Sequence, residues 1–376
     1  MLLSVNAGSS SLKVSVFDSQ NLEAPRDSLA IEDLVIPGES LKEAITRINT
    51  WLTDDLSIQP SEITAIGHRV VHGGERFAAA SPITTELLAY LESITPLAPN
   101  HMPGALASIN AFLLAYPKAK QIACFDTSFF HDVPLIAQTL PIPLSLQKEA
   151  GIRRYGFHGL SYASLLASFK QHEGETAHQG RVIMAHLGSG ASVAVCKNGR
   201  PIDMSMGFTP VSGIMMSTRS GDLEPGLLTY LETEKGMTPA ELTDLVTYKS
   251  GLLGVSETTA DMHALLDSQT ENPQAALAIE LFCYKITKTL GAYTAALGGV
   301  DSIIFSGGIG ERSAEIRQRI CQNLGFFGVE IDESRNSQNA RLISSDSSTV
   351  GVHVIPARED HAIITQTLAV IDKEIS

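Results

Sequence analysis

The sequence contains little cysteine, no apolar run of transmembrane length and no excess of positive charge. The cysteines are far apart and form no C-x-x-C pair, which argues against a disulfide framework and a thiolate metal site. They are Cys124, Cys196, Cys283 and Cys321. The first residues also lack the basic start of a secretion signal. These absences predict a cytoplasmic protein with no membrane partner.

Basic residues are outnumbered by acidic ones. The chain has 27 Lys and Arg residues against 41 Asp and Glu residues, so its net charge is −14 at pH 7. A field of that sign repels nucleic acid and anionic membrane surfaces, and we expect neither as a partner. An anionic ligand therefore has to be held by a local group of arginines, lysines and backbone N–H groups. The length of 376 residues and the 44 % hydrophobic content suit two globular domains.

The first thirteen residues predict a hairpin whose tip suits a phosphate. Leu2 to Val5 are typical of a buried strand, and residues 12–16 alternate between apolar and polar side chains as in a second strand. The tip between them is Ala7 to Ser11. The segment around it, Asn6 to Lys13, offers backbone N–H groups, hydroxyls and a lysine, and it contains no carboxylate. The P-loop spacing is absent. An ordinary Ser/Gly turn stays open as the interpretation of this segment alone.

A second copy of this hairpin occurs half a chain later. Val182 to Met184 predict another buried strand, and His186 to Ser192 form a second tip of small residues before a return strand. When the two tips are aligned, Asn6 matches His186. The repeat predicts a duplicated architecture with two phosphate-facing hairpins opposed across a cleft.

Three polar residues stand at positions where an ordinary core would have none. Arg69 follows the predicted strand Ile63–Ile66, and its guanidinium can bind two oxygens of a carboxylate or phosphate, with a structural salt bridge as the alternative. Asp126 follows the predicted strand Ile122–Phe125, where ligand-binding acids cluster, although a helix N-cap role fits equally well. His158 lies between two glycines, which permit close approach of a ligand.

The second half of the chain carries two more candidates for anion binding. The loop Ser217–Asp222 consists of small residues around Arg219. The strand predicted over Asp301–Phe305 leads into Gly307–Gly310 and then into a helix predicted to reach Leu324. This order resembles a nucleotide-binding turn, although it does not match G-x-G-x-x-G.

Seven segments follow one another along essentially the whole chain: NAGSSSLK, GHRVVHGGERF, RRYGFHG, HLGSGAS, DMSMGFTP, TRSGD and GGIGE. In this order they resemble acetate kinase and its relatives that act on other short-chain carboxylates. The resemblance implies an α/β fold of two duplicated ribonuclease H-like domains, as in actin-like ATPases. It also implies reversible transfer of the ATP γ-phosphoryl group to acetate, with Mg²⁺ or Mn²⁺ as cofactor, and a homodimer formed through the carboxy-terminal domain.

The resemblance assigns roles to single residues. The catalytic residues it implies are Arg69, Asp126, His158 and Arg219. Those that bind the acyl substrate are Arg69, Val71, His101, Phe157 and Pro210. Those linked to the metal are Asn6, Asp126 and Glu359. Those that bind nucleotide and phosphate are Ser9, Ser11, Lys13, His186, Leu187, Gly188, Ser189, Gly190, Asp261, Met262, His263, Gly307, Gly308, Ile309 and Gly310.

The chain departs from the usual family pattern at four positions. Ser189 stands where the family has asparagine, which predicts a lost or water-bridged phosphate contact. His263 and Arg312 replace an arginine and an asparagine on the nucleotide side, so the nucleotide preference stays open. Asn100 replaces an apolar residue of the acyl pocket, which keeps propionate or another short-chain acid open as substrate.

We expect two domains. Residues 1–126 with 358–376 are predicted to bind the acyl group and phosphates, and residues 127–357 to bind nucleotide and to dimerise. A regulatory relative that binds nucleotide without strong catalysis stays open on fold alone. Such a protein would not need Arg69, Arg219 and His158 together, and the glycine turn disfavours a donor without adenosine, such as pyrophosphate.

Overall fold

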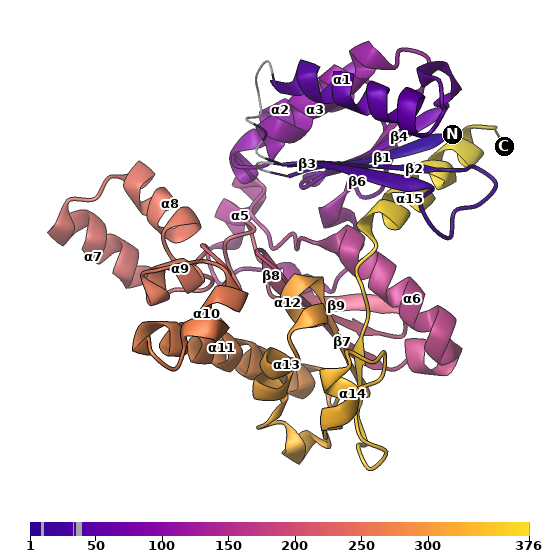
Figure 1. The fold of residues 1–376 in the computed structure, drawn as a ribbon. Coiled ribbons are helices and arrows are strands. Elements are labelled where there is room, and N and C mark those ends of the chain that lie inside the picture. Colours follow the sequence, from indigo (N-terminus) through magenta and orange to yellow (C-terminus); the bar gives the residue numbers. More distant parts are fainter. Residues whose placement is uncertain (9–10, 33, 35–39, 376) are drawn as a thin grey trace. The chain divides into compact units, whose positions relative to one another are not determined.

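The computed structural model describes residues 1–8, 11–32, 34 and 40–375, and the chain divides into two compact units (Figure 1). Unit 1 comprises Met1–His131, Phe157–Ser164 and Arg358–Ser376, and unit 2 comprises Asp132–Gly156 and Leu165–Ala357. The predicted domain boundaries differ from these units because residues 127–131 and 157–164 belong to unit 1.

Unit 1 is built on a six-stranded sheet with the strand order β3-β2-β1-β4-β6-β5. Strands β1, β2 and β3 form an antiparallel meander, and β4 and β6 continue the sheet parallel to β1. The strands are β1 (Leu2–Ala7), β2 (Leu12–Phe17), β3 (Asp27–Ile31), β4 (Ala65–Val70), β5 (Ser81–Pro82) and β6 (Lys120–Phe125). The helices are α1 (Ser40–Thr50), α2 (Thr85–Ser93), α3 (Met102–Ala115) and α15 (Glu359–Ile375).

Both faces of this sheet are buried. Leu3 packs in one cluster with Ile48 of α1 and Phe112 of α3, whereas its neighbour Leu2 packs with Ile364 of α15. Successive strand residues point to opposite faces, so a strand covered on both sides is apolar throughout. Figure 1 shows α15, the last helix of the chain, beside β1 and β4 of the first unit.

Unit 2 repeats the strand order of unit 1. Its sheet runs β11-β10-β7-β8-β9, with an antiparallel meander from β7 to β9 and with β10 and β11 parallel to β7. Thus β7 takes the place of β1, β10 that of β4, and β11 that of β6, which confirms the predicted duplicated α/β fold. The strands are β7 (Arg181–Leu187), β8 (Ala191–Lys197), β9 (Arg200–Met204), β10 (Ser302–Ser306) and β11 (Gly351–Val354).

The helices of unit 2 include one long apolar helix. This is α11 (Pro273–Leu297), which packs on β7 and β8. The others are α4 (Leu135–Gln138), α5 (Leu144–Ala150), α7 (Pro225–Lys235), α8 (Pro239–Tyr248), α9 (Gly251–Ser256), α10 (Met262–Ser268), α12 (Gly307–Arg312), α13 (Ala314–Cys321) and α14 (Glu333–Ser337). Helix α6 (Gly159–His178) begins in unit 1 and ends in unit 2. In the part of the chain that the structure describes, no helix is long and apolar enough to span a bilayer.

Two predicted elements have different bounds in the structure. The strand expected over Ile63–Ile66 is β4, so Arg69 lies within a strand rather than after it. Its neighbour His68 is buried and bonded to Gln121 at 2.8 Å, and burial lowers the pKa of His68 to about 4, so this histidine is neutral at pH 7. The segment Gly307–Gly310, expected as a turn, is the first part of α12, and we keep the name glycine turn for it. The helix expected to reach Leu324 is α13, which is capped by the Ser313 hydroxyl and ends at Cys321.

Candidate active site

Four predicted residues of unit 1 meet in one hydrogen-bonded group, which we call the arginine cluster: Asn6, Arg69, Asp126 and Glu359. Arg69 Nη2 donates to Asp126 Oδ2 at 2.8 Å, and Arg69 Nη1 donates to Asn6 Oδ1 at 3.1 Å. Asn6 Nδ2 donates to Glu359 Oε2 at 2.8 Å. These residues come from the ends of β1, β4 and β6 and from the start of α15, where the sheet order brings them together.

The charges of the arginine cluster depend on burial. Asp126 is fully buried, and burial raises the pKa of its carboxyl group, an effect that the Arg69 guanidinium opposes. Its second oxygen, Oδ1, makes no hydrogen bond of normal geometry in the described chain. Burial alone would lower the pKa of Arg69, but the carboxylates of Asp126 and Glu359 raise it. Arg69 is therefore a permanent cation, and Asp126 is a salt-bridge partner rather than a helix cap.

His158 lies beside the segment that carries Asp126. Its φ of +59° falls in the left-handed region, which non-glycine residues rarely adopt. The next residue, Gly159, passes so close to the Asp126 carbonyl that any side chain at position 159 would clash with it. Strained backbone of this kind persists only where the surroundings hold it, and it is concentrated at functional sites.

Two of the residues predicted to bind the acyl group in unit 1, Val71 and Phe157, are apolar and buried. Val71 and Phe157 are 5 % and 2 % exposed, and the Phe157 ring meets the edge of the His72 ring at a centroid distance of 5.6 Å. His101 directly precedes α3, and Asn100 is half-buried in the turn before it. Sequence reasoning missed His72, although its place in the motif GHRVVHGGERF was a usable signal.

The first hairpin tip is partly described. Asn6 pairs with Lys13 across the β1–β2 ladder, so the exposed lysine lies directly opposite a member of the arginine cluster. The Gly8 N–H donates to the Ser11 carbonyl at 2.8 Å, which closes the turn. Ser9, predicted to bind phosphate, lies outside the described residues.

In unit 2 the glycine turn packs directly on the second hairpin tip. Gly307 has a φ of +76°, and a Cβ atom there would lie 2.7 Å from the Leu187 carbonyl oxygen. Gly188 closes the hairpin by donating to the Gly190 carbonyl at 3.1 Å. Only glycine suits position 307, because any side chain would separate the two elements. The structure thus brings together the residues predicted at 187–190 and 307–310.

The loop Ser217–Asp222, which is predicted to bind an anion, is hydrogen-bonded to the same hairpin tip. The Ser217 N–H donates to the Ser189 carbonyl at 3.2 Å, and Arg219 Nη1 donates to the Pro210 carbonyl at 2.8 Å. His186 lies in β7 opposite Ser192 of β8. The hairpin tip, the second candidate arginine and the predicted acyl-pocket residue Pro210 therefore form one connected region of unit 2.

The three residues predicted on the adenosine side belong to the start of α10. The Asp261 carboxylate caps this helix by accepting from the Ala264 N–H at 2.8 Å, and Met262 is buried. His263 is exposed and pairs with Asp267 at 3.0 Å. The contact of these residues with adenosine stays a prediction. One carboxylate oxygen of Asp261 already accepts the hydrogen bond that caps α10.

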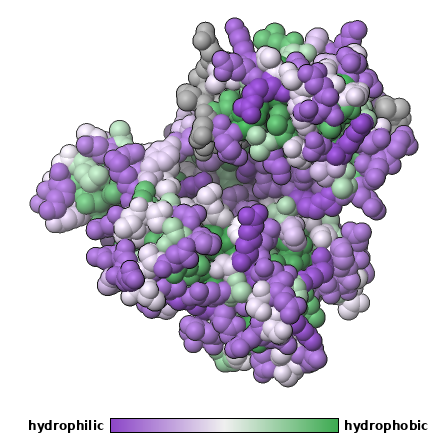
Figure 2. Space-filling model, viewed as in Figure 1, coloured by the Kyte–Doolittle hydropathy of each residue, from purple (hydrophilic) through white to green (hydrophobic). Residues whose placement is uncertain are grey.

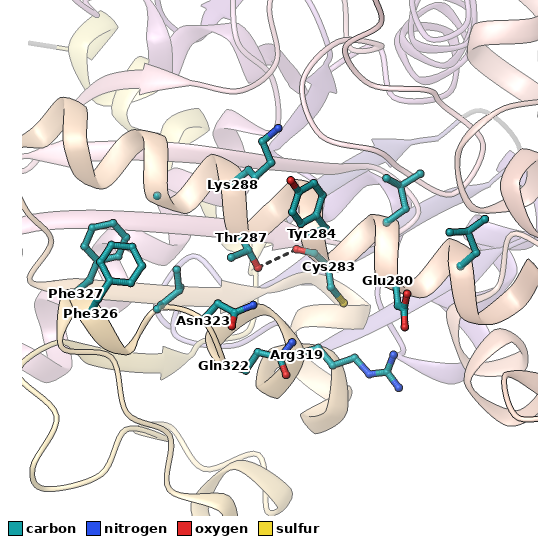
Figure 3. A pocket seen from close by; sticks show the side chains of 14 residues that line it. Glu280, Cys283, Tyr284, Thr287, Lys288, Arg319, Gln322, Asn323, Phe326 and Phe327 are labelled. Atoms are coloured by element: carbon teal, nitrogen blue, oxygen red, sulfur yellow. Dashed lines mark hydrogen bonds between the residues drawn. The ribbon is translucent and has the colours of Figure 1, made fainter. Parts of the chain in front are cut away.

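A separate cavity of about 890 Å³ lies between α11 and α13 (Figure 3). Phe326 and Phe327 close one end of it, and Glu280 and Arg319 lie toward the other end. None of the predicted site residues lines this cavity. It is therefore not part of the candidate active site.

The metal prediction can be tested on the donor atoms present. In the described residues no group of three or more His, Cys, Asp or Glu side chains could hold a metal ion. The arginine cluster offers two such side chains, the carboxylates of Asp126 and Glu359, together with the amide oxygen of Asn6. Hard oxygen donors of this kind suit Mg²⁺, which keeps water and phosphate oxygens as its other ligands. The free, buried Oδ1 of Asp126 is consistent with such a site.

The chain resembles known proteins over nearly its whole length. Residues 1–365 match the acetokinase family. An acetate kinase of Rhodopseudomonas palustris (strain TIE-1) is 40 % identical and covers 96 % of each chain. A propionate kinase of Citrobacter rodentium (strain ICC168) is 38 % identical and covers 98 % of this chain and 96 % of its own. The crystal structure of Porphyromonas gingivalis acetate kinase has 34 % identity and a TM-score of 0.87, covering 98 % of this chain and 99 % of its own.

Proposed function

The chain belongs to the acetokinase family and is a phosphotransferase with a carboxyl group as acceptor; we propose that ATP is its donor and acetate its acceptor. The single observation that supports this most is the arginine cluster. It combines a permanent cation with two carboxylates and an amide at the ends of three strands. A protein that only bound nucleotide would not need this arrangement beside apolar acyl-pocket residues.

The proposed reaction is a direct in-line transfer. Acetate is already a nucleophile at pH 7, so no residue has to act as a strong base. The transition state spreads negative charge over the phosphoryl oxygens, and positioned cations stabilise that charge more than they stabilise the ground state. We assign this role to Arg69 and Arg219, with His158 as a further hydrogen-bond donor. No phosphorylated enzyme residue is required.

We also propose a division of roles between the units. Unit 1 carries the arginine cluster and the buried Val71 and Phe157, which suit the acyl group and the metal. Unit 2 carries the second hairpin tip and the glycine turn, where Gly308 faces open space and offers bare backbone to a nucleotide. The four free, buried cysteines support the proposed cytoplasmic location, because thiols of this kind suit a reducing compartment.

The acceptor can be identified with a hydroxamate-trapping assay on the purified protein. ATP and Mg²⁺ are supplied with acetate, propionate or butyrate, and the acyl phosphate is trapped as the hydroxamate. The highest kcat/KM with acetate is the expected result. A preference for propionate would support the second candidate function, a kinase for a longer short-chain acid. The observation that favours this candidate is the half-buried, polar Asn100 at a position where the family has an apolar acyl-pocket residue. Nucleotide binding with no acyl phosphate from any acid would overturn the proposed function.

Metal dependence is the first predicted effect. When bound, Mg²⁺ would neutralise charge on the phosphates, and Asn6, Asp126 and Glu359 would hold it. EDTA should therefore abolish activity, and Mg²⁺ or Mn²⁺ should restore it. The Glu359→Gln variant should need at least about tenfold more Mg²⁺ for half-maximal activity. The control is Glu374→Gln on the same helix, whose carboxylate pairs with Lys120 near the surface. Equal Mg²⁺ requirements in both variants would remove Glu359 from the metal site.

A homodimer formed through unit 2 is the second prediction. Helix α7 has no buried residue, and Leu227, Tyr230 and Tyr248 of the α7–α8 pair are 39 %, 50 % and 48 % exposed. Figure 2 shows apolar side chains between polar ones on the surface of the α7–α8 pair. Large apolar side chains that are exposed in this way are expected to pack on a partner.

The predicted interface can be tested by charge substitution. The double variant Leu227→Glu, Tyr230→Glu should sediment as a monomer where the unaltered protein sediments as a dimer. Leu114→Glu is the matched control, because Leu114 is 84 % exposed but lies on α3 of unit 1. A dimer that survives the double variant would place the interface elsewhere.

A further inference from the structure

The glycine turn is fastened at its start by one carboxylate. Glu311 Oε1 accepts from the Gly307 N–H at 2.9 Å, from the Ser306 hydroxyl at 3.2 Å and from the Ala357 N–H at 3.1 Å. Ala357 is the last residue of unit 2 before the chain enters the segment that begins α15. One side chain therefore ties the first N–H of the turn to a distant part of the same unit.

The end of the turn is fastened by a buried arginine. Arg317 is fully buried, and its Nη1 donates to the Gly310 carbonyl at 2.8 Å and to the Glu311 carbonyl at 3.0 Å. Its other donors bind Asn336 at 2.8 Å through both Nε and Nη2, and Asn339 at 2.6 Å. All five N–H groups of the guanidinium are thus used, and two of them fix the last carbonyl of the turn and the carbonyl that follows it.

The core alone does not explain an arginine at this position. Arg317 lies among the apolar residues Ile316 and Ile320 of α13, and none of the ion pairs among the described residues involves it. Burial lowers the pKa of Arg317 to about 10, so it is still charged at pH 7. Apolar residues of similar volume often replace buried charges with no loss of stability. What an apolar side chain cannot do is hold two backbone carbonyls in place.

We propose that Glu311 and Arg317 are positioning residues that hold the Gly307–Gly310 turn in the conformation that binds the nucleotide. The proposal rests on the proposed function, since it takes the turn as the nucleotide site. Neither side chain touches the ligand in this scheme, because both act through the backbone of the turn. A turn fixed at both ends loses little conformational entropy on binding, which is the benefit of a preorganised site.

The test measures ADP affinity by calorimetry on four folded variants of the full chain. Arg317→Lys keeps the charge but loses the fork that holds two carbonyls, and Glu311→Ala removes the acceptor that holds Gly307. Each should weaken ADP binding by about tenfold, or 1.4 kcal/mol. Glu311→Gln keeps an acceptor oxygen and should recover most of the affinity. The KM for the carboxylate should stay the same in all variants.

The matched control is Arg335→Met. Arg335 also joins segments of unit 2, by donating to the Ser344 carbonyl and to Asp346, but it makes no bond to the turn. The Arg335→Met substitution should lower the melting temperature without changing the ADP affinity.

Wild-type ADP affinity in folded Arg317→Lys and Glu311→Ala would overturn the proposal. If Arg317→Lys does not fold, the pair Glu311→Ala and Glu311→Gln decides alone. Wild-type protein that binds ADP without forming acyl phosphate would overturn the proposed function but not the positioning role.

Discussion

Replacing Arg69 with alanine is expected to lower kcat by about 10²–10³ or more, while nucleotide affinity stays close to that of the unaltered protein. Arg69 is the only cation of the arginine cluster, and removal of one such preorganised donor raises a barrier by about 2.7–4 kcal/mol. The measurement is steady-state hydroxamate formation together with ADP calorimetry. Arg76→Ala is the control, because Arg76 lies in the same unit and pairs with Glu86 at the surface. Near-normal turnover of the Arg69 variant would exclude Arg69 from catalysis.

The same substitution has a second, pH-dependent effect on stability. Without Arg69 the buried Asp126 loses the charge that opposes its desolvation, so its folded-state pKa rises further above the unfolded value of about 3.9. A carboxyl group of this kind stabilises the fold below its unfolded pKa, and that stability is lost as the pH rises through the folded pKa. The loss in melting temperature should therefore be large at pH 7 and should shrink toward pH 4. A pH-independent loss would mean that removing Arg69 leaves the folded-state pKa of Asp126 unchanged.

Asn6, Arg69 and Asp126 could be singled out because they lie at or just after the ends of predicted short apolar strands. The role of Glu359, at the start of a helix, came only from the family resemblance. Asp126 follows a run of apolar residues, and the hairpin that contains Asn6 recurs around His186, so the strand ends could be located in the sequence. Parallel strands of one sheet end at the same edge, which places such residues near one another without further information.

The residues that hold the glycine turn could not be predicted in the same way. Glu311 bonds Ala357, which is 46 residues later, and Arg317 bonds Asn336 and Asn339 across an intervening loop. Side-chain bonds over such separations leave no periodic pattern. A weak signal did exist, because a charged residue between Ile316 and Ile320 falls on the buried face of a helix. The sequence also did not indicate that the Gly307–Gly310 segment is itself helical, as part of α12.

Replacing Arg219 with alanine is the other change for which we expect a loss of about 10²–10³ in kcat. Unlike Arg69, Arg219 also donates to the Pro210 carbonyl at 2.8 Å, so its removal should loosen the predicted acyl-pocket segment and raise the KM for acetate as well. Arg219→Lys keeps the charge but provides only one compact donor group. Its KM for acetate should therefore stay above that of the unaltered protein, although its positive charge is retained.

The double variant Arg69→Ala, Arg219→Ala tests whether the two arginines act on the same charge. If both stabilise one developing phosphoryl charge, the double variant should lose less than the sum of the two single losses, because the second removal acts on a transition state that is already poorly stabilised. Strictly additive losses would mean that the arginines act on separate steps, for example one on acyl binding and one on transfer. The KM for acetate then tells which, since only Arg219 contacts the segment that carries Pro210 in unit 2.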